Sequence, residues 1–308
     1  LDPGAVIRVR NGIGLLDRDL SAWTQTLKHP AEDHRHSVMA RCTHLQHALP
    51  GTFGLKAAIW LAPILRMRER LAQLRPRVEV GQFAGAAGTL ASLGRQGLAV
   101  AAALMDEWGL ARPLAPWHVA RDGLAETVGL LALITGALSK IAADVMLMMT
   151  TEVAEAAEPF LPGRGASSTM PQKRNPISCE LIRGAARLTR QHAGAMLDGM
   201  EADFERATGP WHVEWSALPE AFVLTSGALA QANFMLGGLE VNTHRMRRNL
   251  DISQGLIMAE AVMMGLAPTL GRTVAHDIVY DACRKASTGG GHLKDALLAD
   301  ATIAAKLD

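Results

Sequence analysis

Residues 163–176 read Gly-Arg-Gly-Ala-Ser-Ser-Thr-Met-Pro-Gln-Lys-Arg-Asn-Pro and lie between two long segments of helical pattern. Two glycines flank Arg164, and Pro171 and Pro176 rule out a continuous helix across the stretch. We therefore predict a loop that carries hydroxyl, lysine and amide side chains. Such a loop is typical of a lid that completes a site on closure, and the alternative is a solvated connection between two helices.

The chemistry of this stretch indicates a small anionic substrate. It is not a phosphate-binding P-loop, because no Gly-Lys-Ser/Thr follows the first glycines, and it lacks the Gly-x-Ser-x-Gly elbow of hydrolases. A serine nucleophile here would need a base from elsewhere, since no histidine lies beside it. Lys173 is a fixed positive charge suited to a carboxylate, and Asn175 can donate to one and accept from a neighbour. The residues alone say no more.

The composition predicts a helical protein without an obvious polyanionic partner. The chain has 308 residues, enough for two or three domains, and 49% of them are apolar but only 4% aromatic. Alanine, leucine and methionine favour helices, and few alternating β-branched runs occur. The 31 basic and 30 acidic residues leave a net charge of +1, which gives no electrostatic case for nucleic acid or an anionic membrane.

Neither a metal, a disulfide nor a cofactor is predicted. Cys42, Cys179 and Cys283 are scattered and unpaired, as expected in a reducing compartment. The clustered histidines have no carboxylate at ligand spacing and fit no zinc pattern, and we interpret most of them as structural. The longest apolar run, residues 128–138, is too short to span a bilayer, and no signal peptide pattern opens the chain. We expect a cytoplasmic protein with no membrane contact.

Apolar periodicity predicts long helices separated by short breaks. The predicted helices cover 5–27, ended by His29-Pro30, then 53–74 with a bend at Pro63, 121–158, 177–200, and a last long one that ends at Leu236. We predict an all-α fold with an elongated central helical bundle over 1–236, which carries the loop 163–176. A smaller C-terminal helical domain, incomplete, covers 237–308.

The loop also carries a resemblance. Residues 167–176 resemble the signature Gly-Ser-Ser-x-Met-Pro-x-Lys-x-Asn-Pro of the fumarase/aspartase superfamily, the class II fumarate lyases, with Ala166 in place of its first glycine. Thr43-His44 and the small-residue turn 82–89 are similar to two further family segments. Within the superfamily the chain looks most like the 3-carboxy-cis,cis-muconate cycloisomerases of aromatic-acid degradation, on residues 43–48, 117–122, 205–215 and 246–251.

The resemblance implies a fold, an assembly and a reaction. It implies a five-helix central bundle, a homotetramer with active sites shared between subunits, and addition–elimination beside a carboxylate of a small di- or tricarboxylate. It gives catalytic roles to Ser167 as base, Lys173 at the carboxylate, and His44 paired with Glu180. The implied substrate-binding residues are Thr43, Gln46, Ser168, Met170, Asn175 and Arg206. A serine hydroxyl is a poor base, so Ser167 needs a setting that stabilises its alkoxide, from Lys173 and main-chain N–H groups.

Three functions stay open at this point. Bacterial cycloisomerases often lack the histidine and glutamate that the lyases keep, and His44 and Glu180 are both present here. The overall pattern therefore favours the cycloisomerase, whereas this pair favours a lyase that releases fumarate from a succinyl adduct, like the adenylosuccinate, argininosuccinate and aspartate enzymes. A non-catalytic scaffold is disfavoured because Ser167, Lys173 and Asn175 are intact.

The resemblance also gives an expectation about the extent of the chain. Leu1-Asp2 aligns just after a Thr/Ser-rich family segment that ends in Gln-Asp and contributes to the site, and Asp308 falls short of the usual family C-terminus. We therefore expect the N-terminal domain to be missing or incomplete in this sequence.

Overall fold

The computed structural model describes residues 2–161 and 163–304, which form two compact units. Unit 1 lies within Leu1–Lys28, Ile59–Met149 and Ala157–Glu240, and unit 2 within His29–Ala58, Thr150–Ala156 and Val241–Asp308. The boundary expected after residue 236 falls close to the end of unit 1, but unit 2 also takes two earlier segments. Helices dominate both units, which confirms the all-α class.

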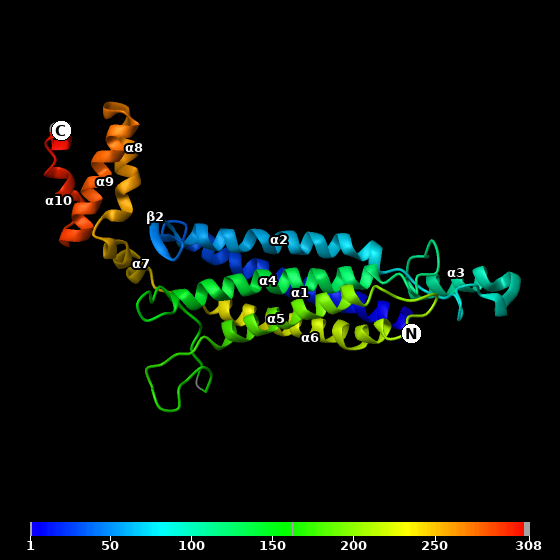
Figure 1. The fold of residues 1–308 in the computed structure, drawn as a ribbon. Coiled ribbons are helices and arrows are strands. Elements are labelled where there is room, and N and C mark those ends of the chain that lie inside the picture. Colours follow the sequence, from blue (N-terminus) through cyan, green and yellow to red (C-terminus); the bar gives the residue numbers. More distant parts are fainter. Residues whose placement is uncertain (1, 162, 305–308) are drawn as a thin grey trace. The chain divides into compact units, whose positions relative to one another are not determined.

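Unit 1 is built from long helices that run side by side (Figure 1). α5 packs closely against both α4 and α6, and α4 also contacts α6. In the sequence, a 3-10 turn and a shorter helix come between α2 and α4. The elements are α1 (Asp2–Asp33), α2 (Phe53–Val78), η1 (Ala91–Gln96), α3 (Gly97–Trp108), α4 (Asp122–Met148), α5 (Ile177–Asp198) and α6 (Pro210–Gly237).

The bundle forms because apolar residues recur at helical spacing and small residues let helices approach. In α4, Leu124, Val128, Leu131 and Leu138 are all buried and lie three, four or seven residues apart. Threonines are buried in the same core, and their hydroxyls donate to carbonyls one turn earlier, as Thr135 does to Leu131. Each buried threonine hydroxyl in this core therefore has a hydrogen-bond acceptor.

Gly12 of α1 lies in close contact with α6. A Cβ atom at this position would lie 2.6 Å from the Phe222 ring, so a larger residue would require that ring to shift.

Two predicted helix ends were wrong. The helix predicted to end at Glu158 ends at Met148, and the following residues turn, with Ala154 at φ +50°. Glu155 and Glu158 are buried there as hydrogen-bond acceptors, so tertiary contacts override their helical propensity. The helix expected to end at His29-Pro30 continues to Asp33, with Pro30 inside its last turns.

Unit 2 joins a β-hairpin to a group of short helices. The hairpin pairs β1 (Val38–Thr43) with β2 (Gln46–Thr52), antiparallel, and no alternation in the sequence indicated it. Val279, Ala282, Leu293 and Leu297 form the core of the helical part. Its elements are α7 (Thr243–Leu250), η2 (Asp251–Ser253), η3 (Leu256–Met258), α8 (Ala259–Leu270), α9 (Arg272–Gly289), α10 (Leu293–Leu298) and α11 (Ala301–Ala304), and the short strands β3 (Ala156–Ala157) and β4 (Glu240–Val241) pair where the units meet in sequence.

One helix in the described part of the chain, α4, is long and apolar enough by itself to cross a membrane. The core helix of a bundle meets the same criterion, and 44% of the most apolar window of α4 is buried within the structure. Its packing against α5 and α6 accounts for its apolar surface.

Candidate functional site

The signature loop is fastened at its first end by Arg164. The Arg164 guanidinium lies 4.0 Å above the Phe234 ring, donates to Ser178 Oγ at 2.7 Å and also hydrogen-bonds Gln231. Ser178 belongs to α5 and the other two partners to α6. The start of the loop is therefore held against the end of the helix pair that supports it.

The second end of the loop is fastened by Arg174. Its guanidinium makes a bidentate pair with Glu240, at 2.8 and 2.9 Å, and donates to the Glu158 carbonyl at 2.5 Å. The hydrogen bonds from Arg174 lower the pKa of the Glu240 carboxyl, and the positive charge of Arg174 lowers it to a smaller degree. Because Arg164 and Arg174 hold both ends, the residues between them form a closed lobe.

The base of the lobe depends on Gly165. The Asn175 N–H donates to the Gly165 carbonyl at 2.9 Å, and Ala166 bridges to Arg174 in antiparallel fashion. Gly165 has φ +71°, and a Cβ atom there would lie 2.7 Å from the Asn175 carbonyl oxygen. Only glycine fits this position without strain.

The tip of the lobe carries the predicted base. The main-chain N–H groups of Met170 and Thr169 donate to Ser167 Oγ at 3.1 and 3.4 Å. Ser167 is half-buried, whereas Ser168, Met170 and Lys173 are exposed. In the described part of the chain the Lys173 ammonium has no ion-pair partner, which leaves it available to an anion.

The N-terminus of α5 is already occupied by a carboxylate. Glu158 is buried and accepts from the N–H groups of Cys179 and Ser178 at 2.8 and 3.0 Å. Burial, and then the neighbouring Glu158, raises the pKa of the Cys179 thiol, so this cysteine is unreactive. Glu180, the predicted partner of His44, lies exposed on the first turn of the same helix.

The other predicted residues of the histidine region lie at the tip of the unit 2 hairpin. Thr43 pairs with Gln46, and His44 and Leu45 form the two-residue turn with φ +48° and +65°. This is the backbone of a type I′ turn, which ordinarily uses Asn-Gly. Two non-glycine residues held at positive φ store strain of the kind found at functional sites. The pairing of His44 with Glu180 stays a prediction, because the two residues belong to different units.

Arg206 lies at the opposite end of α5 from the signature loop. It follows the C-terminal end of α5, and its guanidinium donates to the carbonyls of Gly85 and Ala86 at 3.0 and 2.9 Å, just before α3. α5 has 22 residues and is thus about 33 Å long. Figure 1 shows the loop before α5 at one end of the bundle and α3 at the other.

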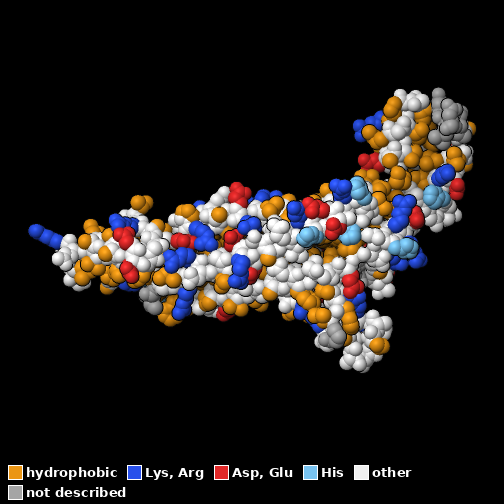
Figure 2. All heavy atoms as spheres, turned by 180° about the vertical axis from the view of Figure 1, so that it is seen from behind, with side chains coloured by type: hydrophobic (Ala, Val, Ile, Leu, Met, Phe, Trp, Pro, Cys, Tyr) orange, Lys and Arg blue, Asp and Glu red, His pale blue; other side chains and the backbone are white. Residues whose placement is uncertain are grey.

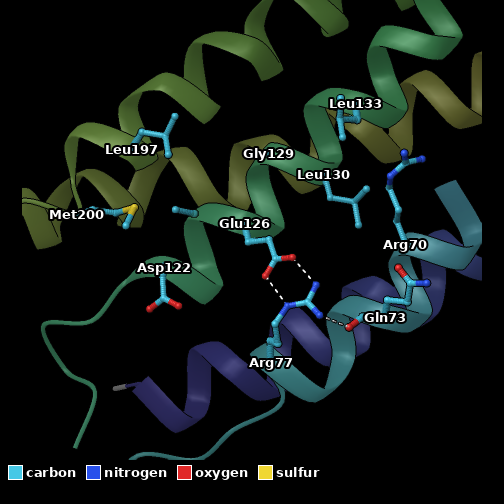
Figure 3. A pocket seen from close by; sticks show the side chains of 11 residues that line it. Arg70, Gln73, Arg77, Asp122, Glu126, Gly129, Leu130, Leu133, Leu197 and Met200 are labelled. Carbon is cyan, nitrogen blue, oxygen red and sulfur yellow. Dashed lines mark hydrogen bonds and ion pairs between the residues drawn. The ribbon is translucent and has the colours of Figure 1, made fainter. Parts of the chain in front are cut away.

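A groove of about 630 Å³ lies on the side of unit 1, lined by residues of α2, α4 and the C-terminal end of α5 (Figure 3). Arg77 of α2 and Glu126 of α4 form an ion pair in it, and Leu130, Leu133 and Met200 also line it. None of the predicted catalytic or substrate-binding residues lines it, so its size does not make it the catalytic site.

The comparisons with known proteins assign the chain to a family. Residues 5–189 match the family described as lyase, and residues 255–308 match the adenylosuccinate lyase C-terminus. The chain belongs to the fumarase/aspartase superfamily. The resemblance of the signature loop to this superfamily is therefore confirmed.

Relatives of this fumarate lyase superfamily chain have diverse names. It is 48% identical over 307 residues to trans-aconitate decarboxylase 1 of Mycosarcoma maydis, a match covering 100% of this chain and 62% of the relative. It is 46% identical to 3-carboxy-cis,cis-muconate cycloisomerase of Pseudomonas aeruginosa, covering 100% of this chain and 67% of the relative. The crystal structure of a fumarate lyase from Mesorhizobium sp. BNC1 matches with TM-score 0.93 and 51% identity, over 99% of this chain and 69% of that one. The chain thus spans less than two thirds of the decarboxylase.

The structure brings some predicted site residues together and separates others. Ser167, Ser168, Met170 and Lys173 share one lobe, with Asn175 at its base and Glu180 on the following helix, whereas Arg206 lies at the far end of α5. Thr43, His44 and Gln46 belong to unit 2. Sequence reasoning gave no role to the residues that hold the lobe: Glu158, Arg164, Arg174 and Glu240. The arginines beside Gly163, Gly165 and Asn175 were a usable signal, but nothing in the sequence links Glu240 to the loop.

Proposed function

We propose that the complete protein is an enzyme of the fumarate lyase type that acts beside a carboxylate of an unsaturated tricarboxylate, most closely as a 3-carboxy-cis,cis-muconate cycloisomerase. The observation that carries this proposal is the lobe, where Ser167 accepts two main-chain N–H groups and where Lys173 has no ion-pair partner among the described residues. The name of the Pseudomonas aeruginosa relative supports the lactonising reaction.

The lobe supplies groups for each step of a lactonisation. One carboxylate oxygen of the substrate bonds to one carbon of a neighbouring double bond. The π electron pair of that double bond then moves to the carbon that lies α to another carboxylate. Lys173 and Asn175 hold the latter carboxylate and stabilise the enediolate, and a proton from Ser167 Oγ reaches the α carbon. The two main-chain N–H groups stabilise the resulting Ser167 alkoxide. In the reverse direction Ser167 is the base.

A second candidate is the decarboxylation of a tricarboxylate. The Mycosarcoma maydis relative is as similar as the cycloisomerase, and trans-aconitate, like carboxymuconate, is an unsaturated tricarboxylate. A lobe that stabilises an enediolate also stabilises the carbanion left when carbon dioxide departs. For this candidate we propose that Thr43, His44 and Gln46 also act on the substrate, as the resemblance implies.

We also propose a homotetramer whose active sites are shared between subunits. Apolar side chains lie on the surface of the structure (Figure 2), and several belong to the long helices of unit 1. A helix that is apolar on all sides is ordinarily buried, so these faces require partners, and another copy supplies matching ones. The exposed apolar residues of α4, α5 and α6 include Leu133, Leu147, Leu181, Leu188, Leu197 and Val223.

The proposed setting is the cytoplasm and the degradation of aromatic acids. Three free cysteines, Cys42, Cys179 and Cys283, support a reducing compartment. The cycloisomerase reaction supports the metabolic role.

The test is spectroscopic and uses the full-length enzyme. It is mixed separately with 3-carboxy-cis,cis-muconate, trans-aconitate and a panel of succinyl adducts, and ultraviolet absorption and carbon-13 spectra are followed. Loss of the muconate chromophore with lactone formation supports the first candidate, and carbon dioxide from trans-aconitate supports the second. Fumarate from an adduct would instead make it a lyase, and no reaction with any substrate would favour the scaffold.

A further inference from the structure

One chain of hydrogen bonds runs from the start of α1 to the turn before α3, all within unit 1. The Asp2 carboxylate lies 2.7 Å from His118 Nδ1, and His118 Nε2 lies 3.1 Å from Arg206 Nη1. The other two guanidinium nitrogens of Arg206 donate to the carbonyls of Gly85 and Ala86. His118 thus stands between a carboxylate and the guanidinium of a predicted substrate-binding residue.

The partners of His118 fix its protonation state. Arginine can only donate, so Nε2 must be a bare acceptor. An ionised carboxylate can only accept, so Nδ1 must carry the proton. Arg121 donates to the other Asp2 oxygen at 3.2 Å, so both carboxylate oxygens act as acceptors in these contacts. The imidazole is therefore the neutral Nδ1–H tautomer, and no other state satisfies both contacts.

The surroundings of His118 are built to hold this state. Asp2, His118, Arg121 and Glu214 are all less than a tenth exposed, and Arg121 also makes a bidentate pair with Glu214 from α6. The Trp211 ring meets the His118 ring edge-on at 4.9 Å. The charged groups that face the imidazole are thus Asp2, Arg121 and Arg206, and a second proton would place an N–H against the Arg206 guanidinium.

We propose that His118 is a positioning residue that orients Arg206 for the substrate. A guanidinium has five N–H groups, and the bonds to His118, Gly85 and Ala86 use one on each nitrogen. The two that remain are held in a fixed direction, as bidentate recognition of a carboxylate requires. This inference rests on the proposed function, which makes Arg206 a carboxylate-binding residue.

The test compares two substitutions in the full-length enzyme. His118→Gln keeps an oxygen that can accept from Arg206 and an N–H for Asp2. His118→Leu removes both. We expect His118→Leu to raise KM about tenfold with kcat little changed, and His118→Gln to stay within about threefold of the wild type.

A matched control and a second measurement separate this proposal from the proposed function. His212→Gln makes the same change at a neighbouring exposed histidine outside the chain of bonds and should leave KM within about twofold. Hydrogen–deuterium exchange of residues 82–89 needs no substrate and should accelerate in His118→Leu but not in His118→Gln. If exchange accelerates in His118→Leu as expected but the wild type turns over none of the substrates, only the proposed function is overturned. If both His118 variants match the wild type, or if Gln is as impaired as Leu, the positioning role is wrong.

Discussion

At the scale of single residues, the proposed chemistry depends on whether a serine hydroxyl can act as an acid and base. Ser167 Oγ accepts from two main-chain N–H groups of its own loop, and a charged Lys173 lies on the same lobe. Fixed N–H donors favour the negatively charged form of the oxygen they face. Ser168, the next residue, is exposed and receives neither donor.

Ser167→Ala should therefore lower kcat by about a thousandfold with little change in KM, because proton transfer and not binding is lost. Steady-state kinetics on whichever tricarboxylate reacts provides the measurement. Ser168→Ala is the matched control and should lower kcat by less than about tenfold. A Ser167→Ala enzyme with normal turnover would disprove the base assignment and leave the fold unaffected.

Leu45 is a second residue with a measurable consequence. It is 84% exposed and held at φ +65° in the hairpin turn, so its side chain contributes strain without burial. Leu45→Gly should raise the free energy of unfolding by about 0.5–1 kcal/mol, because glycine adopts this conformation freely. Urea denaturation of both proteins measures it. Leu49→Gly, in the paired strand β2, should instead lower the free energy of unfolding. If both variants are less stable than the wild type, the proposed strain at Leu45 is refuted.

At the scale of elements, the signature loop is a lobe whose base is tied to distant segments. The Arg174–Glu240 pair lies 66 residues apart in sequence and is only partly exposed on the Arg174 side. Such a pair contributes little to global stability but fixes where the lobe starts and ends. Its loss should therefore affect catalysis more than folding.

Glu240→Gln should lower kcat/KM several-fold, about fivefold, while changing the free energy of unfolding by less than about 1 kcal/mol. Arg174 lowers the pKa of Glu240, so the stability that the pair adds is complete above the ordinary carboxyl pKa and is lost as the pH falls through the lowered value. The stabilities of the wild type and the variant should thus start to converge as the pH falls below the ordinary carboxyl pKa and should become equal only below the lowered pKa of Glu240. Urea denaturation between neutral and acidic pH tests this.

Glu126→Gln is the control for that experiment. Glu126 makes the same bidentate contact with Arg77, and the hydrogen bond likewise lowers its pKa, but it lies on the side groove and not at the lobe (Figure 3). It should reproduce the pH-dependent loss of stability without the loss of kcat/KM. Equal losses of activity in both variants would show that the effect is not specific to the loop.

The elements also show how far the sequence could be used. Helical periodicity predicted α2 and α5 within a few residues, because each has an apolar face and an unambiguous break, and it predicted the C-terminal end of α6 within one residue. The end of α4 could not be predicted, since Glu155 and Glu158 favour helix locally and are withdrawn from it by distant partners. The hairpin escaped notice because His44-Leu45 is not a turn sequence. The reactive side chains of the lobe could be predicted because they lie in one stretch of sequence, whereas the residues that anchor the lobe could not.

At the scale of the whole molecule, one chain does not unite the predicted site. Within unit 1, Ser167 precedes α5 and Arg206 follows it, so a helix of about 33 Å separates them. A small tricarboxylate is much shorter than this helix, so it can touch both Ser167 and Arg206 only if the two residues come from different subunits. The apolar surfaces of α4, α5 and α6 offer the contacts for such an assembly.

Replacing Val223, which is 71% exposed on α6, by glutamate should weaken the assembly and lower activity together, because the charge would be buried between copies. Sedimentation velocity and turnover, measured across a range of enzyme concentrations, give the two quantities. Ser216→Glu introduces the same charge two turns earlier on the same face of α6, beside Glu220, and shows whether the effect is confined to the Val223 position. A variant that remains fully associated and active would exclude this face from the interface.

The sharing of sites can be tested by mixing inactive enzymes. Ser167→Ala and Arg206→Ala should each be nearly inactive as pure full-length proteins. If a site takes Ser167 from one subunit and Arg206 from another, random mixed tetramers contain both residues intact in about a quarter of their sites. Turnover should therefore reappear after the two variants are dissociated together and reassembled. If both residues of a site came from one chain, every site would lack one of them, and the mixture would stay as inactive as its components.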